Sequence, residues 1–317
     1  MINFKLSRFE GAMLGVAVGD ALGAPLEFMT AEQIQAKHGT VRDMIGGGWL
    51  NVEPGEVTDD THMTLAVAKG IIKCPDDPVP AIGKYFFDWY DTKPKDIGNT
   101  CAASLRRAQA VKAQTADDWY GCAEYAHTAS SGQTAGNGAL MRTVYPALYY
   151  MPDEAQQRAA EIARMTHRHD DSTAAVMCYT AAIAEIADAD ENTGTDRAKA
   201  VIERRMQPIR ECSKHDPAPP SGYVIDSAVC AANAIRDTEN FEDALVYAVN
   251  LGGDADTIGA ITGGLAGAVY GAAAIPLCWI NALTNEPNRD KQSGGNALAK
   301  TLIELAHTAY ANRTGEK

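Results

Sequence analysis

The stretch SRFEGAMLGVAV, residues 7–18, decides the fold. Ser7 and Glu10 have the spacing of a capping box, in which each side chain accepts a backbone hydrogen bond, so a helix is predicted to begin here. Small residues on one side of this helix would let another backbone approach closely. Residues 258–277 contain no charge and are mostly glycine and alanine. Because few of their side chains are large, we expect a tightly packed central helix rather than a membrane span, and a shorter helix after Pro276.

Helical patterning continues through most of the chain, without the sustained period-two alternation that strands require. Thr30 and Gln33 form a second capping box, and Gly39 is expected to end that helix. Further helices are expected to begin near Thr61, Pro80, Asn99, Thr115, Pro152, Ser172, Thr195, Asp226, Phe241, Thr257 and Gly295. The strongest break, PAPPSG at residues 217–222, is typical of a surface loop. The prediction is therefore an all-α fold with one domain over residues 1–317.

The overall charge and the cysteines narrow the class of protein. The formal net charge of −13 argues against nucleic acid or an anionic membrane as a partner. Seven cysteines are present and no two form a C-x-x-C pair, which fits reduced thiols buried in the core of a cytoplasmic protein. The first residues lack the apolar run of a signal peptide.

Two acidic clusters are the chemically most informative parts of the sequence: GEVTDDT at residues 55–61 and GGDADT at residues 252–257. Carboxylate and hydroxyl oxygens are hard ligands that suit Mg²⁺ or Mn²⁺ better than Zn²⁺. An adjacent aspartate pair repels itself unless a cation or a proton neutralises it. Two such pairs brought together would make a binuclear site, and the alternative is that each aspartate caps a helix. The glycine run at residues 46–48 leads into the first cluster as a flexible segment or a plain surface turn.

Five motifs resemble those of the ADP-ribosylglycohydrolases, and they occur in the family's order across most of the chain. They are GDALGAPLE at residues 19–27, PGEVTDDT at 54–61, DIGNT at 96–100, GNGALMR at 136–142 and NLGGDADT at 250–257. The resemblance implies an all-α fold with two Mg²⁺ or Mn²⁺ ions, an ADP-ribosylated protein as substrate and ADP-ribose as product. One departure is the sequence Cys101-Ala102-Ala103, where family members often have a basic continuation.

The resemblance also implies roles for individual residues. The metal ligands would be Thr58, Asp59, Asp60, Asp254, Asp256 and Thr257. Glu27 would act as an acid, a base or a water-positioning group, and Asp96 would contact the substrate's guanidinium, with Asp256 completing the catalytic set. The alternatives are a surface carboxylate at a helix end for Glu27 and an N-cap or turn for Asp96. Asp20 could instead brace the loop behind the ligands.

A nucleotide would lie against a different set of residues. Gly136, Asn137 and Gly138 offer backbone N–H groups at the start of a helix, where a diphosphate or a ribose would be bound, although such a run can also be a simple turn. His167 would line the site, or would interact with the end of a helix. Arg142 is either a phosphate partner or part of a structural ion pair. Trp49 and Tyr223 are candidates for stacking on adenine or arginine, or for ordinary packing.

These motifs favour a hydrolase that removes ADP-ribose from arginine, because a carboxylate such as Asp96 can accept two hydrogen bonds from a guanidinium. A second hypothesis keeps the scaffold but places the cleaved bond in serine-linked or O-acetyl-ADP-ribose. A third is a binding or immunity protein that neutralises an ADP-ribosylating toxin. A generic metal-dependent phosphohydrolase is the most distant alternative.

Overall fold

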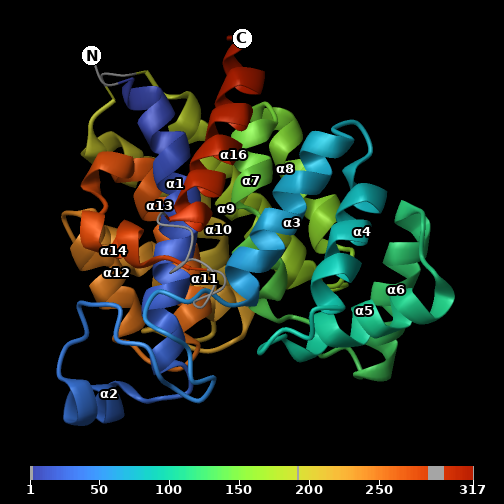
Figure 1. Cartoon of the computed structure of the whole chain (residues 1–317), viewed down its shortest axis with the longest axis horizontal. Helices are drawn as coiled ribbons and strands as arrows, with labels where there is room; N and C mark the ends of the chain where they lie inside the picture. Colours follow the sequence, from blue (N-terminus) through green and yellow to red (C-terminus); the bar gives the residue numbers. More distant parts are fainter. Residues whose placement is uncertain (1–2, 191–192, 285–295, 317) are drawn as a thin grey trace.

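The computed structural model describes residues 3–190, 193–284 and 296–316, and over these ranges the protein is helical (Figure 1). Its α-helices are α1 (Phe4–Gly23), α2 (Ala31–His38), α3 (Asp59–Lys73), α4 (Pro78–Tyr90), α5 (Asn99–Val111), α6 (Ala116–Ala129), α7 (Val144–Tyr149), α8 (Pro152–Ala163), α9 (Asp170–Asp188), α10 (Thr195–Cys212), α11 (Val224–Arg236), α12 (Phe241–Val249), α13 (Ala255–Tyr270), α14 (Leu277–Ala282) and α16 (Ala297–Thr314). Three 3₁₀ turns complete them: η1 (Ala24–Leu26), η2 (Asn137–Arg142) and η3 (Ala272–Ala274). Within the described ranges there are only isolated β-bridges and no strand, so the all-α prediction is confirmed.

The centre of the molecule is the pair α1 and α13, which lie side by side although they are far apart in sequence (Figure 1). Glycines spaced four apart on α1 face small residues of α13, and a Cβ added at Gly15 would lie 2.1 Å from the carbonyl oxygen of Gly263. The same holds at Gly19, where a Cβ would lie 2.0 Å from the carbonyl oxygen of Gly259. The predicted close approach of a second backbone is therefore present, and its partner is the predicted central helix.

Most helix starts match the sequence prediction to within about two residues, as expected for pattern-based boundaries. The capping box of Thr30 and Gln33 is confirmed, and α2 ends at Gly39. The prediction that Ser7 opens the first helix is wrong, because α1 begins at Phe4 and the side chain of Asn3 accepts the N–H of Leu6. Asparagine caps a helix as well as serine does, so the earlier cap prevails.

Two further details of the helix prediction differ from the structure. The short helix α7 follows η2 directly and was not anticipated, since its six residues are too few to show a helical period. The start expected near Gly295 falls outside the described residues, and α16 is described from Ala297. Ser7 also has a different role from the one predicted: its Oγ accepts the backbone N–H of Ala272 at 3.0 Å, which joins α1 to the turn η3.

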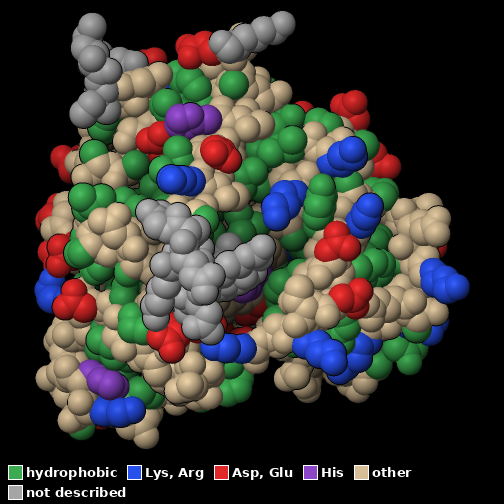
Figure 2. Space-filling view, in the orientation of Figure 1, with side chains coloured by type: hydrophobic (Ala, Val, Ile, Leu, Met, Phe, Trp, Pro, Cys, Tyr) green, Lys and Arg blue, Asp and Glu red, His purple; other side chains and the backbone are tan. Residues whose placement is uncertain are grey.

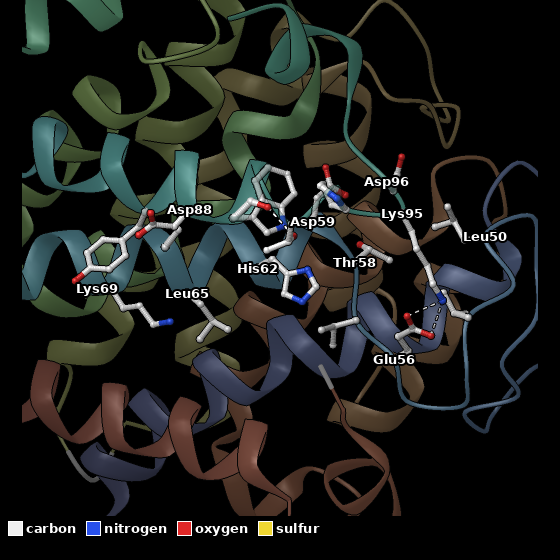
Figure 3. Close-up of a pocket in the computed structure, with 17 residues that line it drawn as sticks. Leu50, Glu56, Thr58, Asp59, His62, Leu65, Lys69, Asp88, Lys95 and Asp96 are labelled. Carbon is white, nitrogen blue, oxygen red and sulfur yellow. Dashed lines mark hydrogen bonds and ion pairs between the residues drawn. The ribbon is translucent and has the colours of Figure 1, made fainter. Parts of the chain in front are cut away.

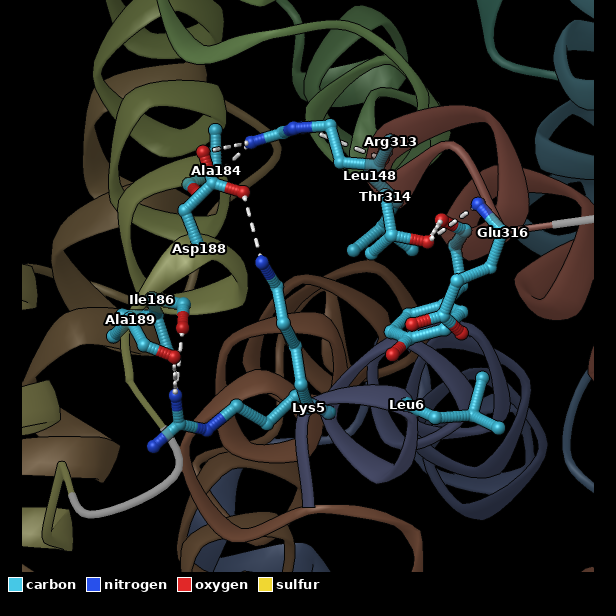
Figure 4. A network of polar contacts seen from close by, with 12 residues as sticks. Lys5, Leu6, Leu148, Ala184, Ile186, Asp188, Ala189, Arg313, Thr314 and Glu316 are labelled. Atoms are coloured by element: carbon cyan, nitrogen blue, oxygen red, sulfur yellow. Dashed lines mark hydrogen bonds and ion pairs between the residues drawn. The ribbon is translucent and has the colours of Figure 1, made fainter. Parts of the chain in front are cut away.

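Buried arginines fasten the outer helices to this core (Figure 4). Arg8 of α1 donates to the carbonyl oxygens of Ile186 and Ala189 at 3.0 and 3.1 Å, where α9 ends. Arg313 of α16 forms an ion pair of 2.8 Å with Asp188, which also lies 3.7 Å from Lys5. The helices at both ends of the chain are thereby held against the carboxyl end of α9.

All seven cysteines are free, and burial in the core, the usual position of such thiols, holds for three of them. Cys101, Cys122 and Cys230 are buried, whereas Cys74, Cys212 and Cys278 are exposed at or beside helix ends. On the face drawn in Figure 2, acidic and basic side chains are interspersed. No helix in the described ranges is long and apolar enough to cross a membrane.

Candidate active site

The two acidic clusters meet where helices α3 and α13 begin. Asp59 and Asp60 are the first two residues of α3, and Asp256 is the second residue of α13. The hydroxyl of Thr257 donates to Asp60 Oδ2 at 3.3 Å, across 197 positions of the sequence. Helix N-termini favour negative charge, so both helices direct their dipoles at the same acidic centre. Capping by side chains does not explain the clusters, because neither N-cap residue, Thr58 nor Asp254, makes a side-chain cap bond.

Asp20, near the end of α1, braces the first cluster. Its carboxylate accepts hydrogen bonds from the backbone N–H and the hydroxyl of Thr58 and of Thr61, with the Thr61 hydroxyl at 2.5 Å. Burial raises the pKa of Asp20 to about 6, and these four donors oppose the rise. Asp20 therefore fixes the entry to α3, which is the role that the sequence left open for it.

Three carboxyl groups from separate segments converge on one point. Oxygens of Glu27, Asp96 and Asp256 all lie within 4.8 Å of one another. Burial and, to a lesser extent, the charges of Asp96 and Asp254 raise the pKa of Glu27 to about 8, although the hydrogen bond from Trp49 opposes the rise. Burial also raises the pKa of Asp96 and, much more strongly, that of Asp256, to which Asp60 contributes by repulsion. Such a set requires protons or cations to neutralise it.

The donor set fits divalent cations. Asp60 Oδ1 is buried without a hydrogen-bond partner, which is unusual for a buried carboxylate oxygen. The surrounding ligand atoms are all oxygens of Asp, Glu and Thr, the kind that Mg²⁺ and Mn²⁺ prefer. Of the six predicted ligands, Asp59, Asp254, Asp256 and Thr257 line one cleft, while Thr58 and Asp60 lie buried beside them. All six are thus brought together around one acidic centre.

The same cleft, which has a volume of about 450 Å³, is also lined by the residues predicted for the nucleotide, called here the nucleotide wall. Gly136, Asn137, Gly138 and His167 all line it. The helix predicted after Gly136 is the 3₁₀ turn η2, and the N–H of Asn137 is already bonded to the carbonyl oxygen of Gly222 at 3.0 Å. The Asn137 side chain donates to Asp254 Oδ2 at 2.7 Å, so the nucleotide wall and the acidic wall are directly joined.

His167 is part of the nucleotide wall, and Arg142 lies behind it. His167 is buried, its ring contacts the Thr166 hydroxyl at 2.8 Å, and burial and the charge of Arg142 lower its pKa to about 3. Arg142 donates to the same Thr166 hydroxyl at 2.6 Å and lies over the ring of Phe86, 4.9 Å from its centroid. Its guanidinium is engaged inside the core, so it is neither the phosphate partner nor the ion pair that the sequence suggested.

The two candidate stacking residues have different positions. Trp49 lies at the rim of the cleft and its Nε1 donates to Glu27 Oε2 at 2.5 Å. Tyr223 lies behind Gly136 and its hydroxyl donates to Asp171 at 2.6 Å, so it is held away from the acidic centre. Phe28, which sequence reasoning missed, is 68% exposed at the same rim, and nothing in its local pattern signals a site residue.

The cleft is also lined by residues that the sequence does not single out as site residues: Asn99, Thr100, Cys101, Met141 and Gly222. Asn99, Thr100 and Met141 belong to two of the five motifs, and Gly222 belongs to the predicted surface loop. A loop rich in proline and glycine thus contributes its last residue to the cleft.

A second cavity, of about 560 Å³, adjoins the cleft (Figure 3). Asp59 and Asp96 line both, and from them the cavity runs between α3 and α4 towards Lys69 and Asp88. At its other end Lys95 forms an ion pair with Glu56 at 2.7 Å. Asp59 and Asp96 therefore lie between the cleft and this second cavity.

The comparisons with known proteins agree with this geometry. The model of the family described as ADP-ribosylglycohydrolase matches residues 1–314. The chain is 35% identical over 297 residues to the ADP-ribosyl-[dinitrogen reductase] glycohydrolase of Rhodospirillum rubrum, covering 92% of this chain and 95% of that protein. It is 32% identical to the ADP-ribosylarginine hydrolase Tri1 of Serratia proteamaculans, covering 89% and 76% of the two chains.

A solved structure gives the same result for the fold. A chain described as an ADP-ribosylglycohydrolase-related protein complex superposes with a TM-score of 0.76 at 29% identity, covering 98% of this chain and 99% of that one. A more distant relative, the ADP-ribosylhydrolase ARH3 of Gallus gallus, is 21% identical over 86% of this chain and 88% of its own.

Proposed function

Because the chain belongs to the ADP-ribosylglycohydrolase family, we propose that it is a metal-dependent hydrolase that removes ADP-ribose from arginine side chains of modified proteins. The observation that carries the proposal is the convergence of Asp96, Glu27 and Asp256 in the cleft that Gly136 and His167 line from the other side. One cleft then holds a guanidinium partner, an acid or base and a nucleotide wall. Two relatives that are 32% and 30% identical to this chain have names that specify arginine.

We propose that two Mg²⁺ or Mn²⁺ ions bind at the acidic centre. The residues that would hold them are Thr58, Asp59, Asp60, Asp254, Asp256 and Thr257. When bound, such cations neutralise the carboxylates and provide a fixed attachment for the vicinal hydroxyls of the ribose. The unpartnered Asp60 Oδ1 and the raised pKa values of Asp59, Asp60 and Asp256 support this assignment, because each calls for positive charge nearby.

The protein's own groups then act on the substrate. Asp96 accepts hydrogen bonds from the planar guanidinium and holds the leaving group in line. Glu27 accepts the proton of the attacking water, with its Oε2 held by Trp49 and its other oxygen free for the water. The bond to the anomeric carbon breaks through an oxocarbenium-like state, which the surrounding carboxylate oxygens stabilise. The departing guanidine takes up the proton that Glu27 accepted from the water, so the products are the unmodified arginine side chain and ADP-ribose.

The nucleotide part of the substrate would lie along Gly136, Asn137, Gly138 and His167. A Cβ at Gly138 would lie 3.3 Å from the ring of His167, so the glycine leaves room beside that ring for a ligand. His167 stays neutral because of its lowered pKa and can contact a base without adding charge. Since the cysteines are free, we also propose that the protein acts in the cytoplasm.

The test is to incubate the protein with arginine-linked and serine-linked ADP-ribosyl peptides and with O-acetyl-ADP-ribose, in Mg²⁺, Mn²⁺ or EDTA, and to identify the products by mass. We expect release of ADP-ribose from the arginine-linked peptide with either ion and none in EDTA. Cleavage of the serine-linked or O-acetyl substrate alone would overturn the arginine assignment. Binding of ADP-ribosylated protein without cleavage would favour the non-catalytic alternative.

A further inference from the structure

Trp49 is 53% exposed, and yet its indole makes a short hydrogen bond to a buried carboxylate. The Nε1–H donates to Glu27 Oε2 at 2.5 Å. Among the described residues it is the one hydrogen-bond donor to the Glu27 side chain. An exposed tryptophan contributes little to the core, so the folded state alone gives no reason for a large aromatic residue at this position.

The loop around Trp49 is built to hold it there. Gly47 and Val52 exchange two backbone hydrogen bonds, of 2.7 and 2.9 Å, which close the loop on both sides of the tryptophan. Gly48 has a φ of +70°, and a Cβ on it would lie 2.8 Å from the backbone of Pro25. The loop therefore packs directly on the turn η1 that precedes Glu27, and only glycine permits both the conformation and the approach.

A second exposed aromatic residue completes the arrangement. Phe28 follows Glu27 with a φ of +63°, and its ring centroid lies 5.3 Å from that of Trp49. Phe28 and Trp49 both line the catalytic cleft. The indole that bonds the carboxylate of Glu27 is thus fixed by its own loop and by the ring of Phe28.

Glu27 needs such a restraint because its other neighbours repel it. Oxygens of Asp96 and Asp256 lie within 4.8 Å of its own, and no cation from Lys or Arg is bonded to it among the described residues. Repulsion of like charges favours side-chain conformations that move the carboxylate out of the cleft. A hydrogen bond to a charged acceptor counters this and fixes the direction of the free oxygen.

We propose that Trp49 is a positioning residue for the reaction: its indole N–H holds the Glu27 carboxylate in the orientation from which it takes the proton of the attacking water. The inference rests on the proposed function. Loss of the N–H then lowers the rate of the chemical step and leaves substrate binding almost unchanged, because the nucleotide wall and Asp96 are untouched.

The experiment measures kcat and KM on an arginine-linked ADP-ribosyl peptide for Trp49→Phe and for Trp49 replaced by 3-benzothienylalanine, an isostere that has sulfur in place of the N–H. We expect kcat to fall about tenfold in both, with KM within about twofold of wild type. Trp89→Phe is the matched control, since the Nε1 of Trp89 has no hydrogen-bond partner and lies outside the cleft. It should keep the wild-type kcat. Wild-type kcat in the benzothienylalanine protein would overturn the proposal even if Trp49→Phe folds poorly.

A second readout does not depend on activity. The four tryptophans give four indole N–H resonances in a ¹⁵N-correlated NMR spectrum, which the Trp49→Phe and Trp89→Phe proteins assign. The Trp49 resonance should lie well downfield and should move upfield in Glu27→Ala, whereas the Trp89 resonance should not move. A Trp49 resonance that ignores Glu27→Ala would overturn the contact. If the wild type cleaves no ADP-ribosyl substrate, the proposed function fails first, and this is distinguishable from an active wild type with an unaffected Trp49→Phe.

Discussion

The interface between α1 and α13 is apolar along its middle and carries buried acidic side chains at one end. Along residues 11–19 of α1 and residues 259–267 of α13, backbone meets backbone with almost no side chain between them. At the end of the same interface Asp20 and Asp256 are buried together with the start of α3. The first region is apolar and dense, whereas the second gathers carboxylates that form no ion pair with Lys or Arg within the described ranges.

The difference shows which part of the structure stabilises the fold and which part the function requires. Close packing of backbones gives a rigid frame that tolerates little change. Buried, mutually repelling carboxylates destabilise the folded protein unless a ligand binds. The close packing of α1 and α13 holds the acidic groups near one another despite their repulsion. Substitutions in the glycine region should therefore change stability, and substitutions in the acidic region should change activity.

The largest effect is expected at the glycine interface. Gly15→Ala places a Cβ 2.1 Å from a backbone oxygen of α13, so the helices must separate and the protein should lose more than about 4 kcal/mol of stability or fail to fold. Urea unfolding measures this. Gly121→Ala in α6 is the control, because a Cβ there meets nothing within 4 Å and alanine favours the helix. Equal stability of the Gly15→Ala protein and the wild type would show that the interface is not rigid.

Substitutions at the acidic end should lower activity strongly and should not lower stability. Asp60→Asn and Asp256→Ala should lower kcat at least about a hundredfold, because each removes a ligand and the charge that holds a cation. Titration calorimetry should lose at least one metal-binding event. In EDTA these variants should be as stable as the wild type or more stable, since a repelling carboxylate is gone. Full activity of Asp256→Ala in EDTA would exclude the binuclear site.

The substitution Asp96→Ala should affect recognition of the arginine in the substrate and should leave metal binding unchanged. Hydrolysis of the arginine-linked peptide should fall about ten- to a hundredfold, because the guanidinium loses its carboxylate partner. Asp88→Ala, at the far end of the adjoining cavity, is the control and should keep the wild-type rate. Both metal-binding events should remain in Asp96→Ala. Loss of one of them would assign Asp96 to the metal site.

A smaller effect is expected on the nucleotide wall. Asn137→Ala should weaken ADP-ribose binding by about 1–2 kcal/mol if the amide bonds the ligand. Ser227→Ala serves for comparison, because it removes one partner of that amide at 2.9 Å and leaves the amide in place. Unchanged affinity in Asn137→Ala, measured by calorimetry, would give the turn a structural role only.

The last prediction concerns pH. A carboxyl group with a higher pKa in the folded protein binds its proton more tightly when folded. Its contribution to stability is therefore full below the unfolded pKa of about 4 and is lost as pH rises through the folded pKa. With Asp20 at about 6 and Glu27 at about 8, the melting temperature in EDTA should rise as pH falls from 8 to 5. Added Mg²⁺ should flatten this slope. A melting temperature that falls with pH over that range in EDTA would contradict the assignment.

The sequence alone predicts the all-α fold and most helix starts, and it contains the acidic residues that the structure brings into one cleft. Capping at Thr30, the glycine repeat of α1 and the apolar stretch before Pro276 are local signals, so the helices were predictable. The acidic clusters were recognisable by composition and order. By contrast, Trp49 and Phe28 reach the cleft through a loop whose course depends on contacts with Pro25, and Arg142 is engaged by Thr166 from another helix end. Such contacts are set by tertiary packing, which local patterns do not contain.

The pairing of α1 with α13 has a consequence for synthesis on the ribosome. Helix α1 emerges first, but its glycine face has no partner until α13 follows more than about 200 residues later. At roughly 5–20 residues per second, that interval lasts on the order of 10–40 seconds. During it a helix with weak intrinsic propensity, rich in glycine, must remain unfolded or be held by a chaperone. The core can therefore form only after the carboxyl-terminal third of the chain, which contains α13, has been synthesised. We expect chains truncated before α13 to aggregate rather than to form a partly native structure.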